Sequence, residues 1–176
     1  KRKATRVIAL GMGESTLSSK EWSGLKQALA GFKKILVVAG QNDDDPALYF
    51  ALKAFHSVHP WTFAGDVLGN LHALPFFCRH PDTFLGQLPE AAKQRLQPDL
   101  LITFGKSLIA KNLKLYLRMY RPKQHWHLQA SGETADTFQS LSKIIPVNPP
   151  LFFDQLKKIS LPPQKSWATY EKLWMN

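Results

Sequence analysis

The sequence predicts an α/β fold, a Rossmann-like three-layer sandwich with a mostly parallel sheet of five to six strands. Short runs of apolar and β-branched residues alternate with longer segments of helical periodicity, which is the order of βαβ units. The expected strands are apolar without interruption, as in sheets covered by helices on both faces. The chain has 176 residues, 44% of them hydrophobic, which suits one domain with its own core.

The first helix is predicted over residues 22–29. Ser18 and Glu21 precede it with the spacing of a capping box, in which each side chain accepts a hydrogen bond from the other residue's backbone N–H. Residues 1–20 are assigned to a linker that leads into the domain, with an added strand expected over 5–10.

The first buried strand is predicted over residues 34–39, because it is rich in Ile, Leu and Val and ends at a glycine. The next helix is expected to begin at Pro46 with Asp45 as its N-cap. A second strand follows over residues 61–64. The expected apolar face of the helix comprises Ala47, Phe50, Ala51, Ala54 and Phe55.

The second half of the chain continues the alternation. The remaining predicted elements are helices over 90–96, 107–120 and 151–159 and strands over 99–105, 125–128 and 144–147. We expect one domain over residues 21–159. Residues 160–176 open on a segment with two prolines and are assigned to a linker toward a C-terminal domain that this chain lacks. The absence of an initial Met also suggests a piece of a longer protein.

The composition sets the class of partner that we expect. The chain carries 23 Lys and Arg residues against 13 Asp and Glu, for a formal net charge of +10, a balance that is frequent in nucleic-acid-binding proteins. The basic residues are spread along the chain, however, without a zinc finger, an arginine–glycine tail or an aromatic strip. We therefore expect no nucleic acid as partner and favour anionic small molecules. The one concentration of basic residues comprises Lys106, Lys111, Lys114, Arg118, Arg121 and Lys123.

Neither a membrane span nor a disulfide is expected. No apolar run approaches the roughly 20 residues that a helix needs to cross a bilayer. Cys78 is the single cysteine, so it has no partner within the chain and no cysteine-based zinc site is available. This cysteine usage favours a reducing, cytoplasmic setting.

Four loops are candidates for a binding site. Ligands of open parallel sheets bind at the carboxyl ends of the strands, which here lead into residues 40–45, 65–70, 105–111 and 129–136. In the third loop, Gly105-Lys106-Ser107 follows the clearest strand and opens the predicted helix over 107–120. Free N–H groups at a helix start favour an anion, while an ordinary tight turn capped by Ser107 explains the same residues.

The predicted helix over 107–120 has two distinct faces. Its basic residues are spaced three or four apart, so they share one face, and apolar residues fall opposite them on the side expected to be buried. Lys114, Arg118 and Arg121 are expected to be solvated. Lys111 differs, because it lies one turn into the helix near the ends of the strands, where its amine reaches a bound ligand. The expected buried face comprises Ile109, Leu113, Tyr116 and Tyr120.

Other chemical motifs are incomplete. Gly11-Met12-Gly13 lacks the third glycine of a dinucleotide fingerprint. Three consecutive aspartates, 43–45, fit helix capping better than metal binding. His125 and His127 alternate along a strand and so point to one side, but zinc requires a further ligand. No catalytic residue, cofactor-binding residue or metal ligand is assigned within the chain.

Residues 98–113 resemble a known family. After the strand, Gly105, Ser107, Leu108 and Lys111 keep the spacing found in the middle domain of the 2-succinyl-5-enolpyruvyl-6-hydroxy-3-cyclohexene-1-carboxylate synthases, the thiamine-diphosphate enzymes of menaquinone biosynthesis. The resemblance runs from about residue 33 to 159. Softer matches are Gly65-Asp66-Val67-Leu68, His125-Trp126-His127 and Asp136-Thr137-Phe138.

The resemblance implies a transferase of three α/β domains. Its thiamine diphosphate and Mg²⁺ are bound by the two outer domains, which this chain lacks, so no cofactor is expected here and the isolated piece is expected to be inactive. Family members decarboxylate 2-oxoglutarate and add the succinyl-semialdehyde unit to isochorismate. They assemble as dimers or tetramers, largely through the two outer domains.

The resemblance also implies which residues meet the substrates. Lys111 corresponds to the family's substrate-facing lysine. Asn112 stands where relatives can carry a second cation, and it is expected to donate an uncharged hydrogen bond. Two alternatives remain open: the central domain of an acetolactate synthase-like enzyme, for which a bound flavin is expected, and a free-standing basic module that binds anions or nucleic acid.

Overall fold

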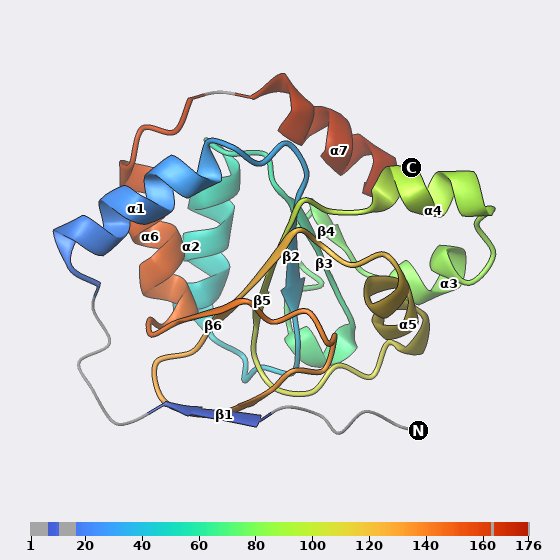
Figure 1. Cartoon of the computed structure of the whole chain (residues 1–176), viewed down its shortest axis with the longest axis horizontal. Helices are drawn as coiled ribbons and strands as arrows, with labels where there is room; N and C mark the ends of the chain where they lie inside the picture. The colour runs from blue at the N-terminus through green and yellow to red at the C-terminus, as the bar shows by residue number, and fades with distance from the viewer. Residues whose placement is uncertain (1–6, 11–16, 163, 176) are drawn as a thin grey trace.

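The fold is a parallel sheet between two layers of helices (Figure 1). The computed structural model describes residues 7–10, 17–162 and 164–175. Six strands lie in the order β4-β3-β2-β5-β6-β8, and every neighbouring pair is parallel. The predicted three-layer α/β class is therefore confirmed. The strands are β2 (Ile35–Ala39), β3 (Thr62–Gly65), β4 (Phe77–Cys78), β5 (Leu100–Phe104), β6 (Gln124–Leu128) and β8 (Lys143–Ile145).

Helices cover both faces of the sheet. In Figure 1, α1, α2 and α6 lie on one side of the strands and α3, α4 and α5 on the other. No helix among the described residues combines the length and the hydropathy needed to span a bilayer. The helices are α1 (Ser19–Leu29), α2 (Pro46–His56), α3 (Pro81–Leu85), α4 (Glu90–Leu96), α5 (Lys111–Met119), α6 (Pro149–Lys158) and α7 (Lys165–Met175), with a short 3₁₀ turn η1 (Val67–Gly69).

The two faces of β2 show how the strands divide the core. Ile35 and Val37 belong to the hydrophobic cluster under α1, α2 and α6. Leu36 and Val38 point the other way, into the cluster under α3, α4 and α5. All are buried, which explains why the strand is apolar at every position rather than at every second one.

The helix starts follow the expected chemistry. Ser18 and Glu21 form the capping box at the start of α1. Asp45 caps α2, because its Oδ1 accepts hydrogen bonds from the N–H groups of Ala47 (2.9 Å) and Leu48 (3.3 Å). The helix over 90–96 is confirmed as α4 at both ends.

The buried face of α2 differs from the expected one. Phe50 is 65% exposed and packs edge-on against Tyr49, and Ala47 is also exposed. The helix is apolar around most of its circumference, so its pattern left open which stripe faces the sheet. The residues that are buried are Leu48, Ala51, Leu52 and Phe55.

A helix occupies the segment that the sequence assigned to a C-terminal linker. α7 runs over Lys165–Met175 and buries Trp167, Tyr170 and Trp174. The indole N–H of Trp167 donates to the carbonyl of Phe32 (2.8 Å) and the hydroxyl of Tyr170 donates to that of Leu96 (2.6 Å). Phe32 and Leu96 precede β2 and β5, so α7 covers the amino-terminal ends of the strands and leaves their carboxyl ends open (Figure 1).

A second, smaller sheet lies apart from the first. β1 (Val7–Leu10) pairs antiparallel with β7 (Gly132–Ala135). β1 falls within the strand expected over residues 5–10, of which residues 5 and 6 lie outside the described part. Gly11, Met12 and Gly13, the incomplete dinucleotide motif, also lie outside the described residues. β7 belongs to the loop that follows β6, so the small sheet lies at the carboxyl end of the large one.

Candidate functional site

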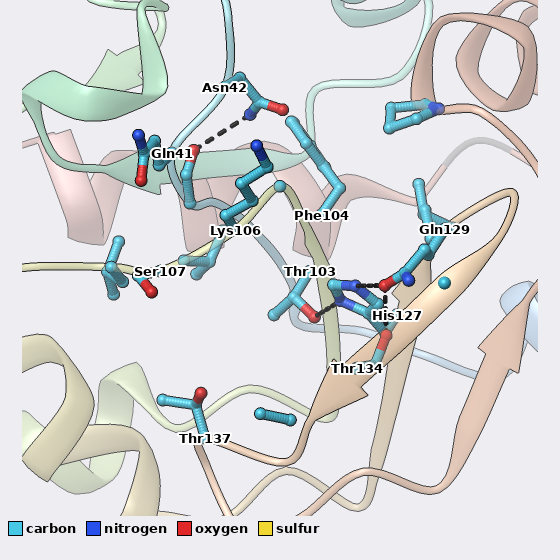
Figure 2. Close-up of a pocket in the computed structure, with 18 of the residues that line it drawn as sticks. Gln41, Asn42, Thr103, Phe104, Lys106, Ser107, His127, Gln129, Thr134 and Thr137 are labelled. Atoms are coloured by element: carbon cyan, nitrogen blue, oxygen red, sulfur yellow. Dashed lines mark hydrogen bonds between the residues drawn. The ribbon is translucent and has the colours of Figure 1, made fainter. Parts of the chain in front are cut away.

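A pocket opens at the carboxyl ends of β2, β5 and β6 (Figure 2). From β2 the chain continues outward to β3 and β4, whereas β5 starts the half that continues to β6 and β8. The pocket thus lies at the point where strand order reverses, the usual ligand position in such sheets. Its volume is about 590 Å³. Three of the four candidate loops contribute, with residues 40–43, 105–108 and 129–135 among the lining segments.

One hydroxyl joins two buried histidines in the pocket wall. Thr103 Oγ1 lies 2.8 Å from His125 Nε2 and 2.8 Å from His127 Nδ1. The contacts follow from strand pairing, since Thr103 of β5 stands beside His127 of β6 and the two histidines alternate along β6. Both histidines point to the same side, as the sequence predicted.

The partners of Gln129 fix the direction of this chain of hydrogen bonds. Its Nε2 donates to the carbonyls of Ser131 (2.7 Å) and Glu133 (3.2 Å). Its Oε1 therefore faces His127 Nε2 at 3.1 Å and also accepts from the hydroxyl of Thr134 (Figure 2). Because an amide oxygen only accepts, His127 must carry its proton on Nε2.

The proton on His127 Nε2 determines which groups donate in the rest of this chain of hydrogen bonds. His127 Nδ1 is then an acceptor, so the Thr103 hydroxyl donates to it and accepts from His125 Nε2–H. His125 Nδ1, 3.2 Å from Ser140 Oγ, accepts from that hydroxyl. Both imidazoles are neutral, since burial, together with His127, lowers the pKa of His125 to about 3, and burial also lowers the pKa of His127.

The pair does not form part of a metal site in the described chain. No three His, Cys, Asp or Glu side chains come together there in a way that would hold a metal ion. Every ring nitrogen of the two histidines already has a protein partner. The pair supplies a neutral, hydrogen-bonded wall.

Lys111 lies outside this pocket. It is the first residue of α5, its side chain is exposed, and it forms no ion pair with any residue that the structure describes. The lysine that does line the pocket is Lys106. The loop 105–111 therefore offers two ammonium groups in two different settings.

The helix predicted over 107–120 begins four residues later. Residues 107–110 form a loop, in which the Asp66 carboxylate accepts hydrogen bonds from the N–H groups of Ile109 (2.6 Å) and Ala110 (3.1 Å). Ile109 is 57% exposed rather than buried. Leu113, Tyr116 and Tyr120 are buried, as predicted.

Because α5 begins at Lys111, the residues Gly105-Lys106-Ser107 do not form a helix start. The three residues form a turn with Gly105 at φ +79°, where a Cβ would approach the backbone of Gln41 to 2.9 Å. The backbone N–H of Lys106 donates to the carbonyl of Gln41 (2.8 Å). Ser107 does not cap α5, so the tight turn is the better of the two explanations and no helix start is offered to an anion there.

Asn112 has a contact within the fold. Its Nδ2 donates to the carbonyl of Asp82 in α3 (3.0 Å), and the Asp82 carboxylate accepts from the N–H of Leu113 (2.9 Å). The amide of Asn112 is half-buried between α5 and α3. The sequence did not predict the contacts of Asp66 and Asp82 with residues 109–113, because these contacts join positions 30 to 44 residues apart.

The other cations of α5 and of the residues just after it lie at the surface or near it. Arg118 is exposed and its Nε donates to the carbonyl of Thr137 (2.8 Å). Arg121 is also exposed, and Lys114 is half-buried. Lys123 pairs with Asp99 at 2.9 Å.

Cys78 is buried, which raises the pKa of its thiol to about 11 and makes it a packed side chain rather than a nucleophile.

Comparison with known proteins gives a consistent set of relatives. No protein-family model matches the chain. The chain is 38% identical over 132 residues to the 2-succinyl-5-enolpyruvyl-6-hydroxy-3-cyclohexene-1-carboxylate synthase of Cytophaga hutchinsonii, 32% identical over 158 residues to that of Desulfotalea psychrophila, and 28% identical over 174 residues to that of Bacteroides thetaiotaomicron. These matches cover 75%, 90% and 97% of this chain but only 23%, 28% and 30% of the relatives.

Proposed function

The chain is homologous to one segment of the 2-succinyl-5-enolpyruvyl-6-hydroxy-3-cyclohexene-1-carboxylate synthases, and on that premise we propose that it serves as the central domain of such an enzyme. Eight curated relatives bear this name, at 28–38% identity. The chain spans less than a third of their length, which supports a role within a larger polypeptide. The three-layer α/β fold agrees with this role.

The proposed reaction needs groups that bind carboxylates. The full enzyme decarboxylates 2-oxoglutarate and adds the succinyl-semialdehyde unit to isochorismate, and both substrates are polycarboxylates. Thiamine diphosphate, held with Mg²⁺ by the two outer domains, supplies the electron sink for the decarboxylation. We therefore assign this chain to substrate binding and structural support.

Lys111 is the residue that we assign to the substrates. One observation carries this: its ammonium group is exposed at the start of α5, on the carboxyl-end rim, and has no ion-pair partner among the described residues. A charge-assisted hydrogen bond to a substrate carboxylate there contributes roughly 1.5–3 kcal/mol. Asn112 is given a supporting part, since its amide already donates to Asp82.

Replacing Lys111 in the full-length enzyme tests the assignment. Lys111→Ala is expected to raise KM for isochorismate or 2-oxoglutarate roughly 10- to 100-fold, the equivalent of the lost charge-assisted bond. The affinity for thiamine diphosphate is expected to stay unchanged. Steady-state kinetics with each substrate varied in turn gives the comparison, and Lys114→Ala, on the same helix, is the matched control. Unchanged kinetics for both substrates would remove Lys111 from the site.

Two other functions are tested with the same preparation. A flavin absorbance band in the purified protein would favour an acetolactate synthase-like enzyme. Steep salt-dependent retention on DNA or RNA would favour a basic nucleic-acid-binding module. The names of the curated relatives support neither. A dimeric or tetrameric full-length enzyme in a reducing, cytoplasmic setting completes the proposal.

A further inference from the structure

Lys111 occupies a position that a helix does not favour for a cation. It is the first residue of α5, and the N-terminal end of a helix carries partial positive charge. Ala110, at the N-cap position, offers no side-chain hydrogen bond to the free N–H groups. Something else must hold this segment, and two aspartates from other parts of the chain do so.

Asp66 uses both carboxylate oxygens in this contact. Its Oδ1 accepts from the N–H of Leu68 (3.0 Å), within the η1 turn that follows β3. Its Oδ2 accepts from the N–H groups of Ile109 (2.6 Å) and Ala110 (3.1 Å), the two residues before Lys111. The carboxylate thus ties the backbone on the N-terminal side of Lys111 to the end of the neighbouring strand.

Asp82 holds the other side. Its Oδ1 accepts from the N–H of Leu113 (2.9 Å), and its backbone carbonyl accepts from Asn112 Nδ2 (3.0 Å). Asp82 lies in the first turn of α3, which packs against α5. The residues on both sides of Lys111 are therefore fixed by groups from distant segments.

Neither carboxylate forms an ion pair with Lys111 among the described contacts. Both bind backbone N–H groups instead, so they offset the positive helix end without occupying the ammonium group. The two aspartates therefore hold the backbone of residues 109–113, while the ammonium group of Lys111 stays available to a ligand.

We propose that Asp66 and Asp82 are positioning residues that fix Lys111 toward the substrate carboxylates. This inference rests on the proposed function of Lys111. An aspartate is required at position 66 because both oxygens accept hydrogen bonds. An asparagine there would turn an NH₂ group toward either Leu68 N–H or the pair at Ile109 and Ala110.

A double-mutant cycle in the full-length enzyme tests the proposal. Asp66→Asn is expected to raise KM for the substrate that Lys111 binds roughly tenfold, with kcat within about twofold, because the lysine is misplaced rather than removed. The double variant with Lys111→Ala should be no worse than Lys111→Ala alone, since Asp66 acts through the lysine. Asp45→Ala, which removes a carboxylate cap from α2, is the control and should leave both constants unchanged.

The outcomes separate the two proposals. If Lys111→Ala raises KM and the effects of Asp66→Asn and Lys111→Ala multiply in the double variant, or Asp66→Asn is silent, the positioning role is overturned while the proposed function stands. If Lys111→Ala itself is silent, the proposed function fails and the positioning role fails with it.

Should Asp66→Asn fold poorly, Asp82→Ala replaces it in the same cycle. Faster hydrogen–deuterium exchange over residues 105–113 in either variant, with normal exchange elsewhere, is the expected structural readout.

Discussion

A single hydroxyl, that of Thr103, links two imidazoles in the pocket wall whose protonation is fixed from Gln129. It accepts from His125 and donates to His127, so both ring systems are held in one tautomer without a charge. Sequence alone predicted that the two histidines share a side of the strand. The hydroxyl between them was not predicted, because it depends on the register between β5 and β6, which brings Thr103 beside His127.

Removing this hydroxyl should destabilise the fold. Thr103→Val keeps the side-chain shape but leaves buried His125 and His127 each without one hydrogen-bond partner, and a buried polar group left in this way costs roughly 1–3 kcal/mol. Urea unfolding of the two proteins gives the free-energy difference. Thr62→Val is the matched control, because the buried Thr62 hydroxyl has no hydrogen-bond partner in the described structure. An equal loss in both variants would contradict the role given to Thr103.

The same histidines predict how stability depends on pH. Folding lowers the pKa of His125 from its ordinary 6.5 to about 3, so between these values the unfolded chain binds a proton that the folded chain does not. Stability is therefore complete above pH 7 and falls as the solution is acidified. From His125 alone the free energy of unfolding should drop by about 2 kcal/mol between about pH 7 and pH 5. Urea titrations at the two pH values measure this, and a flat profile would contradict the neutral pair.

Among the elements, α5 and α7 depart most from expectation. α5 was predicted too long because residues 107–110 have no helix breaker, and long-range bonds hold them as a loop: Asp66 accepts from Ile109 and Ala110, and Gln41 N–H donates to the carbonyl of Ser107. α7 was assigned to a linker because two prolines precede it, although Trp167, Tyr170 and Trp174 have helical spacing. That spacing was a usable signal. In both elements, contacts distant in sequence decided between the local alternatives.

α7 should contribute strongly to stability. Trp174 is 2% exposed and packs edge-on against Tyr116 and Phe84, so Trp174→Ala is expected to cost about 3–5 kcal/mol. The neighbouring Met175 is 43% exposed, and Met175→Ala should change stability by less than about 0.5 kcal/mol. Thermal unfolding followed by circular dichroism compares the two. Equal, small effects would show that α7 is not anchored as described.

At the scale of the whole molecule, the fold was largely predictable and the site only in part. Local features, namely apolar runs, prolines and capping residues, determine the alternation of strands and helices, so the sheet and most elements could be predicted from the sequence. The pocket position followed from the general rule for parallel sheets. The hydrogen bonds within its wall and the setting of Lys111 did not, because Gln129, Asp66 and Asp82 act through partners that only the tertiary structure brings together.

The arrangement also predicts how the isolated chain behaves. If thiamine diphosphate is bound by two other domains, the 176-residue chain should bind no thiamine diphosphate, with or without Mg²⁺, and should not decarboxylate 2-oxoglutarate. Isothermal titration calorimetry of the purified chain measures the first and a carbon dioxide release assay the second. Tight cofactor binding by this chain would contradict the central-domain assignment.

The position of α7 has a consequence for how the chain acquires its structure during synthesis. A nascent chain that has reached Ile159 already contains all six strands of the large sheet. Trp61 still lacks its edge-on contact with Trp167, and the carbonyls of Phe32 and Leu96 still lack the hydrogen bonds from Trp167 and Tyr170. Final packing therefore waits until α7 has left the ribosome. Until then the amino-terminal ends of β2 and β5 lack the cover that α7 gives them, and the chain keeps apolar surface in contact with water.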